Sequence, residues 1–127
     1  TRFVHPTTVV TAAEGDSRDR NYRPLRENLK RLERAKDQEG KRLTVVALPM
    51  PKRVEGPWGR LPASYLNFYI GNGAVLVPTF GHPQDEAALK ILAELFPGRR
   101  VVGIRSETLL LGLGGIHCVT HEQPAYG

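Results

Sequence analysis

Cysteine is almost absent from the sequence: Cys118 is the only one among 127 residues. A chain with one cysteine cannot form an internal disulfide, which excludes a disulfide-stabilised fold and favours a reducing compartment, here the cytoplasm. Long apolar runs are also missing, since none approaches the roughly 18 residues of a membrane-spanning helix. Residues 1–10 lack the charged, apolar and small-residue order of a signal peptide. We therefore expect one globular domain with no membrane partner.

Negative charge is in deficit, and the formal net charge is +5. A basic chain is compatible with a nucleic-acid partner. Between residues 14 and 37, however, the basic residues are interleaved with Asp and Glu, which is typical of a solvated helix face with ion pairs. The sequence has no zinc-knuckle motif, no Arg-rich tail and no alternation of aromatic with basic residues. We expect no nucleic-acid partner, and a nucleic-acid-binding domain is the weakest of three hypotheses.

The first half of the chain, about residues 2–50, predicts a β–β–α–β unit. Two short strands lie within 3–12, on either side of a turn at Pro6. A helix is predicted over 22–36, because the apolar residues there share one face: Leu25, Leu29, Leu32 and Ala35. Gly40 follows this helix, and the apolar run after it predicts a strand over 43–48.

The second half repeats this order over about 64–106, after a Pro/Gly-rich loop at 49–63. Two strands within 64–80 are joined by Gly71-Asn72-Gly73, a turn signal that offers positive φ angles. Pro83 opens a helix over 84–96, and 99–106 predicts the return strand. Aligning VVTA with VLVP, and VVALP with VVGIR, superposes the two units.

A further apolar and glycine-rich segment, 109–124, carries Cys118 and predicts a closing strand. The whole chain, 1–127, is thus one α/β segment of two repeats and an extra strand. Repeat architectures usually need at least three units to seal their core. We therefore expect either a fragment of a larger fold or a chain that completes itself by association, as a homo-oligomer.

Three segments resemble the C-terminal third of agmatine deiminases, within the wider family of bacterial peptidylarginine-deiminase-like enzymes: LPASYLNFYIGNGAVLVPTFG, ILAELFPGRRVVGI and LLLGLGGIHCVTHEQP. The stretch Gly-Gly-Ile-His-Cys followed by Gln-Pro is the most specific part. The resemblance implies the pentein fold, a propeller of five β–β–α–β blades around a central cleft. This chain would then be a partial pentein of about two blades and a closing strand.

The resemblance also implies a reaction. Enzymes of this family hydrolyse a guanidinium group to a ureido group and ammonia, without metal or organic cofactor. A cysteine thiolate attacks the guanidinium carbon and forms a covalent amidino intermediate. Carboxylates hold the planar cation, and a histidine protonates the leaving ammonia and then activates water. For agmatine the product is N-carbamoylputrescine, on the route to putrescine.

Cys118 matches the nucleophile of the family motif, although a plain buried thiol is the alternative. Gly114 and Gly115 would let a substrate approach the backbone closely, as would Gly112. Leu113 departs from the family pattern, because it interrupts what is commonly an unbroken glycine run. We infer that its side chain narrows the entrance or changes the substrate, without removing the chemistry.

None of the four histidines is assigned as the general acid or base. If 109–124 is extended, His117 points away from Cys118. His121 also lies on the wrong face of a continuous strand, although a loop there could turn it inward. His5 precedes Pro6 in a turn, and His82 in Gly-His-Pro is expected to cap the following helix or to be exposed.

Two further residues are candidate substrate contacts. Asn67 is polar within an apolar segment and matches a recurrent family position. It either joins a structural hydrogen-bond network or contacts the cleft. Trp58 lies between Pro57 and Gly59 in the loop, where it either lines the rim of the site or plugs an apolar surface.

The His-x-Asp motif, which in this family holds the acid/base histidine and a guanidinium-binding aspartate, would end just before Thr1. We therefore expect this chain alone to be inactive, as a C-terminal fragment of a deiminase. The alternative from another class is a self-associating binding module that reuses two blades. Agmatine, peptidyl arginine and free arginine all present the same guanidinium, so the substrate stays open among them.

Overall fold

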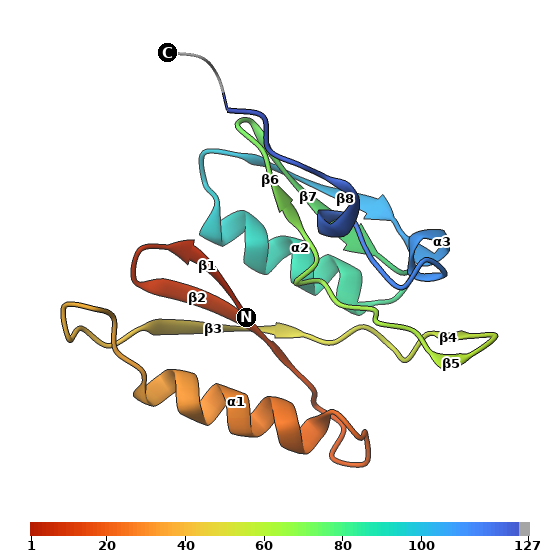
Figure 1. Cartoon of the computed structure of the whole chain (residues 1–127), viewed down its shortest axis with the longest axis horizontal. Coiled ribbons are helices and arrows are strands. Elements are labelled where there is room, and N and C mark those ends of the chain that lie inside the picture. The colour runs from red at the N-terminus through yellow and green to blue at the C-terminus, as the bar shows by residue number, and fades with distance from the viewer. Residues whose placement is uncertain (125–127) are drawn as a thin grey trace.

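The computed structural model describes residues 1–124, and its first part is one β–β–α–β unit (Figure 1). Strands β1 (Arg2–His5) and β2 (Thr8–Ala13) form an antiparallel pair. Helix α1 (Tyr22–Arg34) then crosses over to β3 (Thr44–Pro49), which runs parallel to β2. A helical crossover joins such parallel neighbours, because the chain must return to the starting end of the first strand before the next one begins, and a tight turn is too short for that.

The second part repeats the arrangement, with a shorter first strand. Strands β6 (Tyr69–Ile70) and β7 (Ala74–Thr79) are antiparallel, and α2 (Gln84–Leu95) leads to β8 (Arg100–Arg105), parallel to β7. The pairing register is the one that the sequence alignment of the two halves implies. Val9 lies opposite Val45 in the first sheet, as Val75 lies opposite Val101 in the second.

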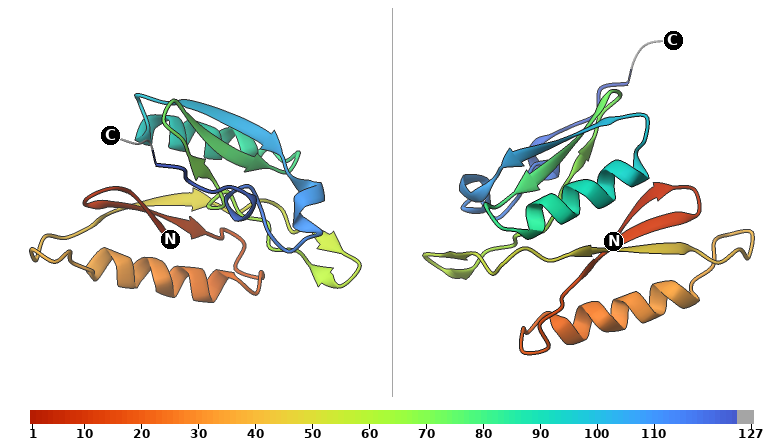
Figure 2. Two further views of the ribbon diagram at one scale, coloured as in Figure 1. Left: turned by 45° about the horizontal axis from the view of Figure 1, so that its top comes forward. Right: turned by 180° about the vertical axis from the view of Figure 1, so that it is seen from behind.

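The two units stack so that α2 lies between the two sheets, whereas α1 covers the other face of the first sheet (Figures 1 and 2). The main core fills this middle layer and draws on β2, β3, α2, β7 and the segment before β6. Its fully buried members are Val10, Leu48, Tyr65, Phe68, Val75, Val77, Ala88, Leu92 and Phe96. Phe68 packs edge-on against Phe96, with ring centroids 6.1 Å apart.

Helix α1 has one packed face only, and none of its residues is fully buried. Its solvent side carries one of the expected ion pairs, from Arg31 Nε to Glu27 Oε1 at 3.1 Å. Such exposed pairs one helical turn apart contribute only about 0.3–0.5 kcal/mol each. No helix within residues 1–124 is long and apolar enough to cross a membrane.

The loop between the units is more ordered than its composition suggests. It contains a two-stranded hairpin, β4 (Glu55–Gly56) and β5 (Gly59–Arg60). Arg60 Nη1 donates to both carboxylate oxygens of Asp19 from the first unit, at 2.7 and 2.8 Å, and both side chains are about 85% shielded from solvent. The Arg60 guanidinium lowers the pKa of Asp19 below its usual value. This pair ties the hairpin to the first unit.

The predicted closing strand over 109–124 is wrong. Helix α3 (Glu107–Leu110) follows β8 directly, and the 3₁₀ helix η1 (His117–Val119) carries Cys118. The chain between them makes local bonds instead of a ladder, such as Gly112 N–H to the Leu109 carbonyl at 3.0 Å. Glycine is a poor strand former, so the glycine-rich run turns rather than extends.

Two smaller expectations also differ from the structure. The strand predicted to begin near residue 64 begins only at Tyr69, because Tyr65 and Phe68 both point into the core at a spacing of three, which fits a turn and not a strand. The Gly71-Asn72-Gly73 turn uses no positive φ angle. Within residues 1–124 positive φ angles occur instead at Gly40, Gly59, Gly81 and Leu113.

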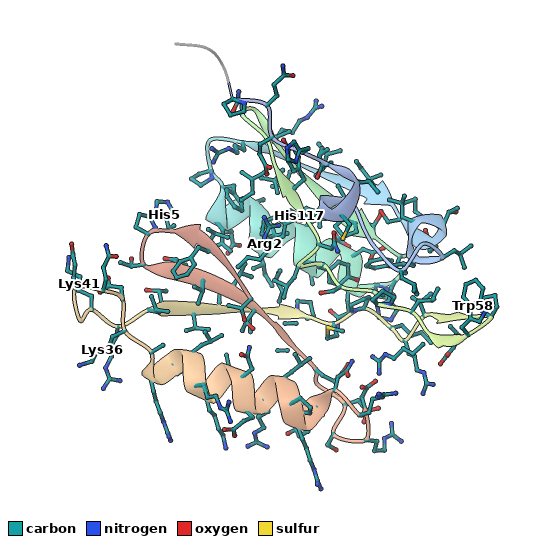
Figure 3. The ribbon with its side chains drawn as sticks, viewed as in Figure 1. Arg2, His5, Lys36, Lys41, Trp58 and His117 are labelled. Atoms are coloured by element: carbon teal, nitrogen blue, oxygen red, sulfur yellow. The ribbon has the colours of Figure 1, made fainter. Side chains whose placement is uncertain are left out.

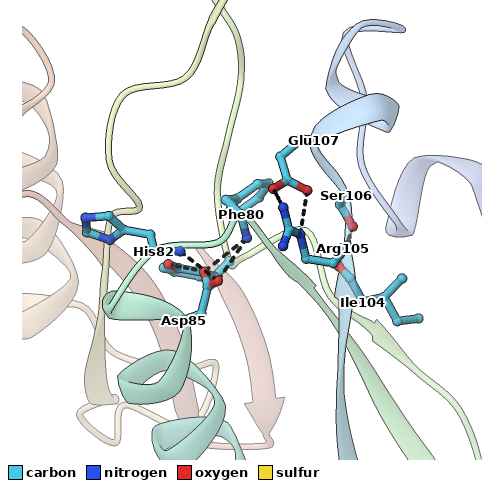
Figure 4. Close-up of polar contacts among 8 residues, drawn as sticks. Phe80, His82, Asp85, Ile104, Arg105, Ser106 and Glu107 are labelled. Carbon is cyan, nitrogen blue, oxygen red and sulfur yellow. Dashed lines mark hydrogen bonds and ion pairs between the residues drawn. The ribbon is translucent and has the colours of Figure 1, made fainter.

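Asp85, in the first turn of α2, organises the end of β7 (Figure 4). Its carboxylate accepts the hydroxyl of Tyr65 at 2.7 Å, the Phe80 N–H at 3.1 Å and the His82 N–H at 3.0 Å. Burial and the neighbouring Asp85 carboxylate raise the pKa of Tyr65 well above its usual value. One side chain therefore satisfies three donors where the chain turns from strand to helix.

Replacing Asp85 with Ala should lower the free energy of unfolding by about 2 kcal/mol, because three donors lose their acceptor and the Tyr65 hydroxyl is left inside the protein. Urea unfolding followed by circular dichroism measures the change. Glu86→Gln is the matched control, since Glu86 is the exposed neighbour in the same helix turn. An equal effect of both substitutions would contradict the role given to Asp85.

Candidate active site

Cys118 lies in η1 with its side chain exposed. The turn that presents it is closed by two local bonds, from the Cys118 N–H to the Gly115 carbonyl at 3.1 Å and from the Val119 N–H to the Ile116 carbonyl at 3.2 Å. Ile116 is 4% exposed and anchors the turn in the protein. The structure thus presents the thiol on the surface of an anchored turn, and not inside a buried strand.

Asn67, in the segment before β6, binds this turn. Its side-chain Oδ1 accepts the His117 N–H at 2.8 Å, and its Nδ2 donates to Cys118 Sγ at 3.4 Å. Its backbone carbonyl also faces the His117 N–H, at 3.2 Å. Residues 51 positions apart are therefore joined by hydrogen bonds at the thiol itself. Asn67 thus has a structural hydrogen bond, to the His117 backbone, and a contact with the candidate nucleophile, Cys118.

The hydrogen bond from Asn67 is the largest cause that lowers the pKa of Cys118 below its usual value, followed by the backbone N–H environment of the turn at Gly115. A donor that points at sulfur stabilises the thiolate more than the thiol. Because the thiolate is the nucleophile, a lower pKa leaves more of the reactive form at neutral pH. The arrangement therefore favours the thiolate form of Cys118.

The glycines before Cys118 allow this packing. A Cβ atom on Gly115 would lie 2.7 Å from Cγ and 2.9 Å from Oδ1 of Asn67, closer than real Cβ atoms approach. A Cβ atom on Gly114 would lie 3.1 Å from Cys118 Cβ and 3.4 Å from its Sγ. Both positions pack directly on the two functional side chains. Packing therefore favours glycine at both positions, in addition to the predicted close approach of a substrate.

Leu113 adopts a φ angle of 60°, the left-handed conformation that favours glycine. Its N–H bonds to the Leu110 carbonyl at 2.9 Å, so it ends the turns that follow α3, where a left-handed residue commonly stops a helix. The side chain is 68% exposed. A glycine at this position would therefore fit the backbone better than leucine does.

The four histidines do not gather around the thiol in one network. His117 and Cys118 are neighbours in a 3₁₀ helix, so the extended backbone on which the argument about His117 rested is absent. His117, His121 and His5 are exposed. His82 accepts the Gln84 N–H through Nδ1 at 3.3 Å, one residue before Pro83, the N-cap residue of α2. No cluster of three His, Cys, Asp or Glu side chains that could hold a metal ion occurs in the described part of the chain.

Trp58 is separated from this group. It sits at the tip of the β4–β5 hairpin, 79% exposed, whereas His117 lies beside the second sheet (Figure 3). Arg2, which sequence reasoning did not single out, lies close to His117 in the same view. Both residues line an open groove of about 410 Å³ with Thr1, Ser64, Leu66 and Asn67. The sequence gives no signal for Arg2. Neighbouring residues of a strand face opposite sides, so an apolar Phe3 that faced the core would leave the charged Arg2 in solvent.

The family model of the Porphyromonas-type peptidyl-arginine deiminases matches residues 1–124. The chain therefore belongs to this family. It is 37% identical to an agmatine deiminase of Stutzerimonas stutzeri over 97% of its own length. It spans only about 38% of the length of that relative, so it corresponds to a part of such proteins.

Solved structures agree with this assignment. A candidate arginine deiminase of Porphyromonas gingivalis superposes with a TM-score of 0.93 at 39% identity, over 97% of this chain and 36% of that one. A cysteine-to-serine variant of the Campylobacter jejuni agmatine deiminase with substrate bound superposes with a TM-score of 0.83 at 28% identity, over 91% of this chain and 33% of that one. The mixed α/β fold with its small sheets is thus the fold of deiminases.

Replacing Asn67 with Ala should raise the pKa of Cys118, because the thiolate loses its donor. The rate of iodoacetamide alkylation at neutral pH should fall, and its pH profile should move to higher pH. Cys118 is the only thiol, so the rate reports on this residue alone. Asn72→Ala, in the exposed hairpin turn, is the control and should leave the profile in place. A profile that Asn67→Ala does not move would contradict the proposed contact.

Replacing Gly115 with Ala should displace Asn67 and move the alkylation profile in the same direction, since the new methyl group needs the space of the amide. The overpacking should also lower the free energy of unfolding by about 1–3 kcal/mol. Gly98→Ala is the control, because no described atom lies within 4 Å of a Cβ there. An unchanged Cys118 profile in a folded Gly115→Ala protein would show that Asn67 does not depend on this packing.

Proposed function

We propose that this chain is the nucleophile-bearing part of a guanidinium-hydrolysing deiminase, with Cys118 as the nucleophile and agmatine as the substrate. The observation that carries the proposal is the hydrogen bond from Asn67 Nδ2 to an exposed Cys118 Sγ. Relatives named agmatine deiminase across 97% of the chain support the substrate. The reaction would belong to putrescine synthesis in the cytoplasm and would need no cofactor.

The chemistry follows from the thiolate. Cys118 Sγ attacks the guanidinium carbon of agmatine, and the tetrahedral adduct expels one nitrogen as ammonia, which takes up a proton. An amidino group stays bound to sulfur. Water then attacks the same carbon, the carbon–sulfur bond breaks, and N-carbamoylputrescine leaves with the thiolate restored. Asn67 contributes to both steps, because its donor stabilises sulfur whenever it carries negative charge.

Gly114, Gly115, Asn67 and Trp58 are our candidates for contact with the substrate. The first three lie at the thiol, where a planar guanidinium would pass over the turn. Trp58 is exposed at the tip of its hairpin. We propose that it contacts the substrate only in the complete site, after a further part of the fold has joined this chain. Agmatine is preferred over peptidyl or free arginine on the names of the relatives alone.

We propose that further blades of a pentein propeller, or partner copies of this chain, supply the rest of the site. The mechanism needs carboxylates for the cation and a histidine as acid and base, and our interpretation places these in a His-x-Asp motif and other blades outside 1–127. Exposed apolar side chains support a covering surface: Phe3 is 59%, Leu113 68% and Val119 68% exposed. The same surface supports the alternative, a self-associating module of two blades.

The proposal predicts that the chain alone releases no ammonia from agmatine. Joined in one polypeptide to the remaining part of the Stutzerimonas stutzeri enzyme, it should release ammonia and N-carbamoylputrescine. Cys118→Ser in that chimera should abolish turnover by several orders of magnitude. Turnover by the chain alone as a monomer, or an active Cys118→Ser chimera, would overturn the proposal. A stable homo-oligomer in analytical ultracentrifugation with no activity in either form would favour the alternative.

A further inference from the structure

Arg2 joins the first unit to the segment that carries Asn67. It lies in β1 (Figure 3). Its guanidinium carbon stands 4.3 Å above the centre of the Phe68 ring. The same guanidinium donates through Nη1 to the backbone carbonyl of Phe68. It is half-buried, and this burial lowers the pKa of Arg2 from its usual value. A planar cation that stacks on a ring and binds the carbonyl of the same residue fixes that residue in two directions.

Phe68 in turn sets the position of Asn67, its neighbour. The Phe68 side chain is fully buried and packs against Phe96, and Arg2 binds the Phe68 carbonyl, so both the side chain and the backbone of this residue are held. Asn67 itself is tied by its N–H to the Ser64 carbonyl at 3.2 Å and by its two oxygens to the His117 N–H. Its Nδ2 reaches Cys118 Sγ at 3.4 Å, an ordinary distance for a hydrogen bond to sulfur. A displacement of this segment would lengthen that bond.

We propose that Arg2 is a positioning residue for Cys118: it holds the Phe68 carbonyl and thereby keeps the Asn67 amide within hydrogen-bond distance of the thiol. The inference rests on the proposed function, in which Cys118 is the nucleophile. It assigns to the first strand of the first unit a part in the chemistry of a residue 116 positions away. Arg2 does not touch the thiol and acts only through Asn67.

A positive charge near a thiol also lowers its pKa through space, and this account must be separated from positioning. The causes that lower the Cys118 pKa among the described residues are hydrogen bonds from Asn67 and the turn, with no contribution from a charged group. The Arg2 charge is itself partly offset by Glu122. His117, exposed beside Cys118, is the other titratable group at this turn. Positioning through Asn67 is therefore the account that the geometry favours.

Arg99 offers a matched control within the same fold. Its guanidinium stands 5.8 Å from the Phe96 ring centre, and its Nε donates to the Gly71 carbonyl at 3.0 Å. It thus combines ring stacking with carbonyl binding, as Arg2 does, but on two different residues, Phe96 and Gly71. Phe96 packs against Phe68, but the Phe68 carbonyl, which the proposal concerns, is bound by Arg2. Arg99→Met removes an interaction of the same kind without touching the thiol.

The test is a double-mutant cycle on the 127-residue chain, read by the pH profile of iodoacetamide alkylation. Arg2→Met should move the Cys118 profile to higher pH by about half a unit, a fall of about threefold in rate at neutral pH. In an Asn67→Ala background, Arg2→Met should cause no further fall. Arg99→Met should leave the profile unchanged. Far-UV circular dichroism shows that each variant is folded.

Arg2→Lys is the second variant, and it replaces Arg2→Met in the cycle if the latter does not fold. Lysine keeps the charge but loses the planar fork, so positioning predicts a slower alkylation than wild type, whereas a charge effect predicts the wild-type rate. The proposal is overturned if Arg2→Met leaves the rate unchanged, if its effect persists in full without Asn67, or if Arg2→Lys equals wild type. None of these readouts depends on deiminase turnover, so they are independent of the test of the proposed function.

Discussion

The hydrogen bonds of Asn67 are the interaction on which the site depends. A single amide accepts the backbone N–H of His117 and donates to the sulfur of Cys118, so the turn and the reactivity of the thiol share one support. An amide with both an acceptor and a donor is needed for this, since a carboxylate at the same place would repel the thiolate. Gly115 is constrained in consequence, because any side chain there would occupy the space of the Asn67 amide.

The two units reach this point from a shared core. Helix α2 packs between both sheets, so burial of Ala88 and Leu92 fixes the second unit on the first. Phe68 belongs to that core and directly follows Asn67. Arg2 adds a contact from β1 to the carbonyl of Phe68. Residues from three places therefore position the thiol: Arg2 in the first strand, Phe68 in the main core and Asn67 in the segment before the second sheet.

Local pattern was enough to predict the helices and the repeat, and it failed where tertiary contacts decide. The apolar stripe of α1 and the Pro83 signal before α2 placed both helices within two residues of their observed ends. The segment around Cys118 resembled a strand because it is apolar, but it has no ladder partner within the described residues and folds as turns. The family motif identified Cys118 and Asn67 as candidates. Their mutual contact, and the role of Arg2, depend on residues 51 and more positions apart that no local pattern reports.

The central claim is that this chain by itself lowers the pKa of Cys118, before any other part of a deiminase site is present. It is tested most directly by titrating the thiol of the folded chain and of the same chain in concentrated urea, with the ultraviolet absorbance of the thiolate as the probe. Cys118 is the only thiol, so the signal reports on this residue. The account predicts a lower pKa in the folded chain than in the unfolded one. An equal or higher pKa in the folded chain would show that Asn67 does not stabilise the thiolate, and would contradict the account.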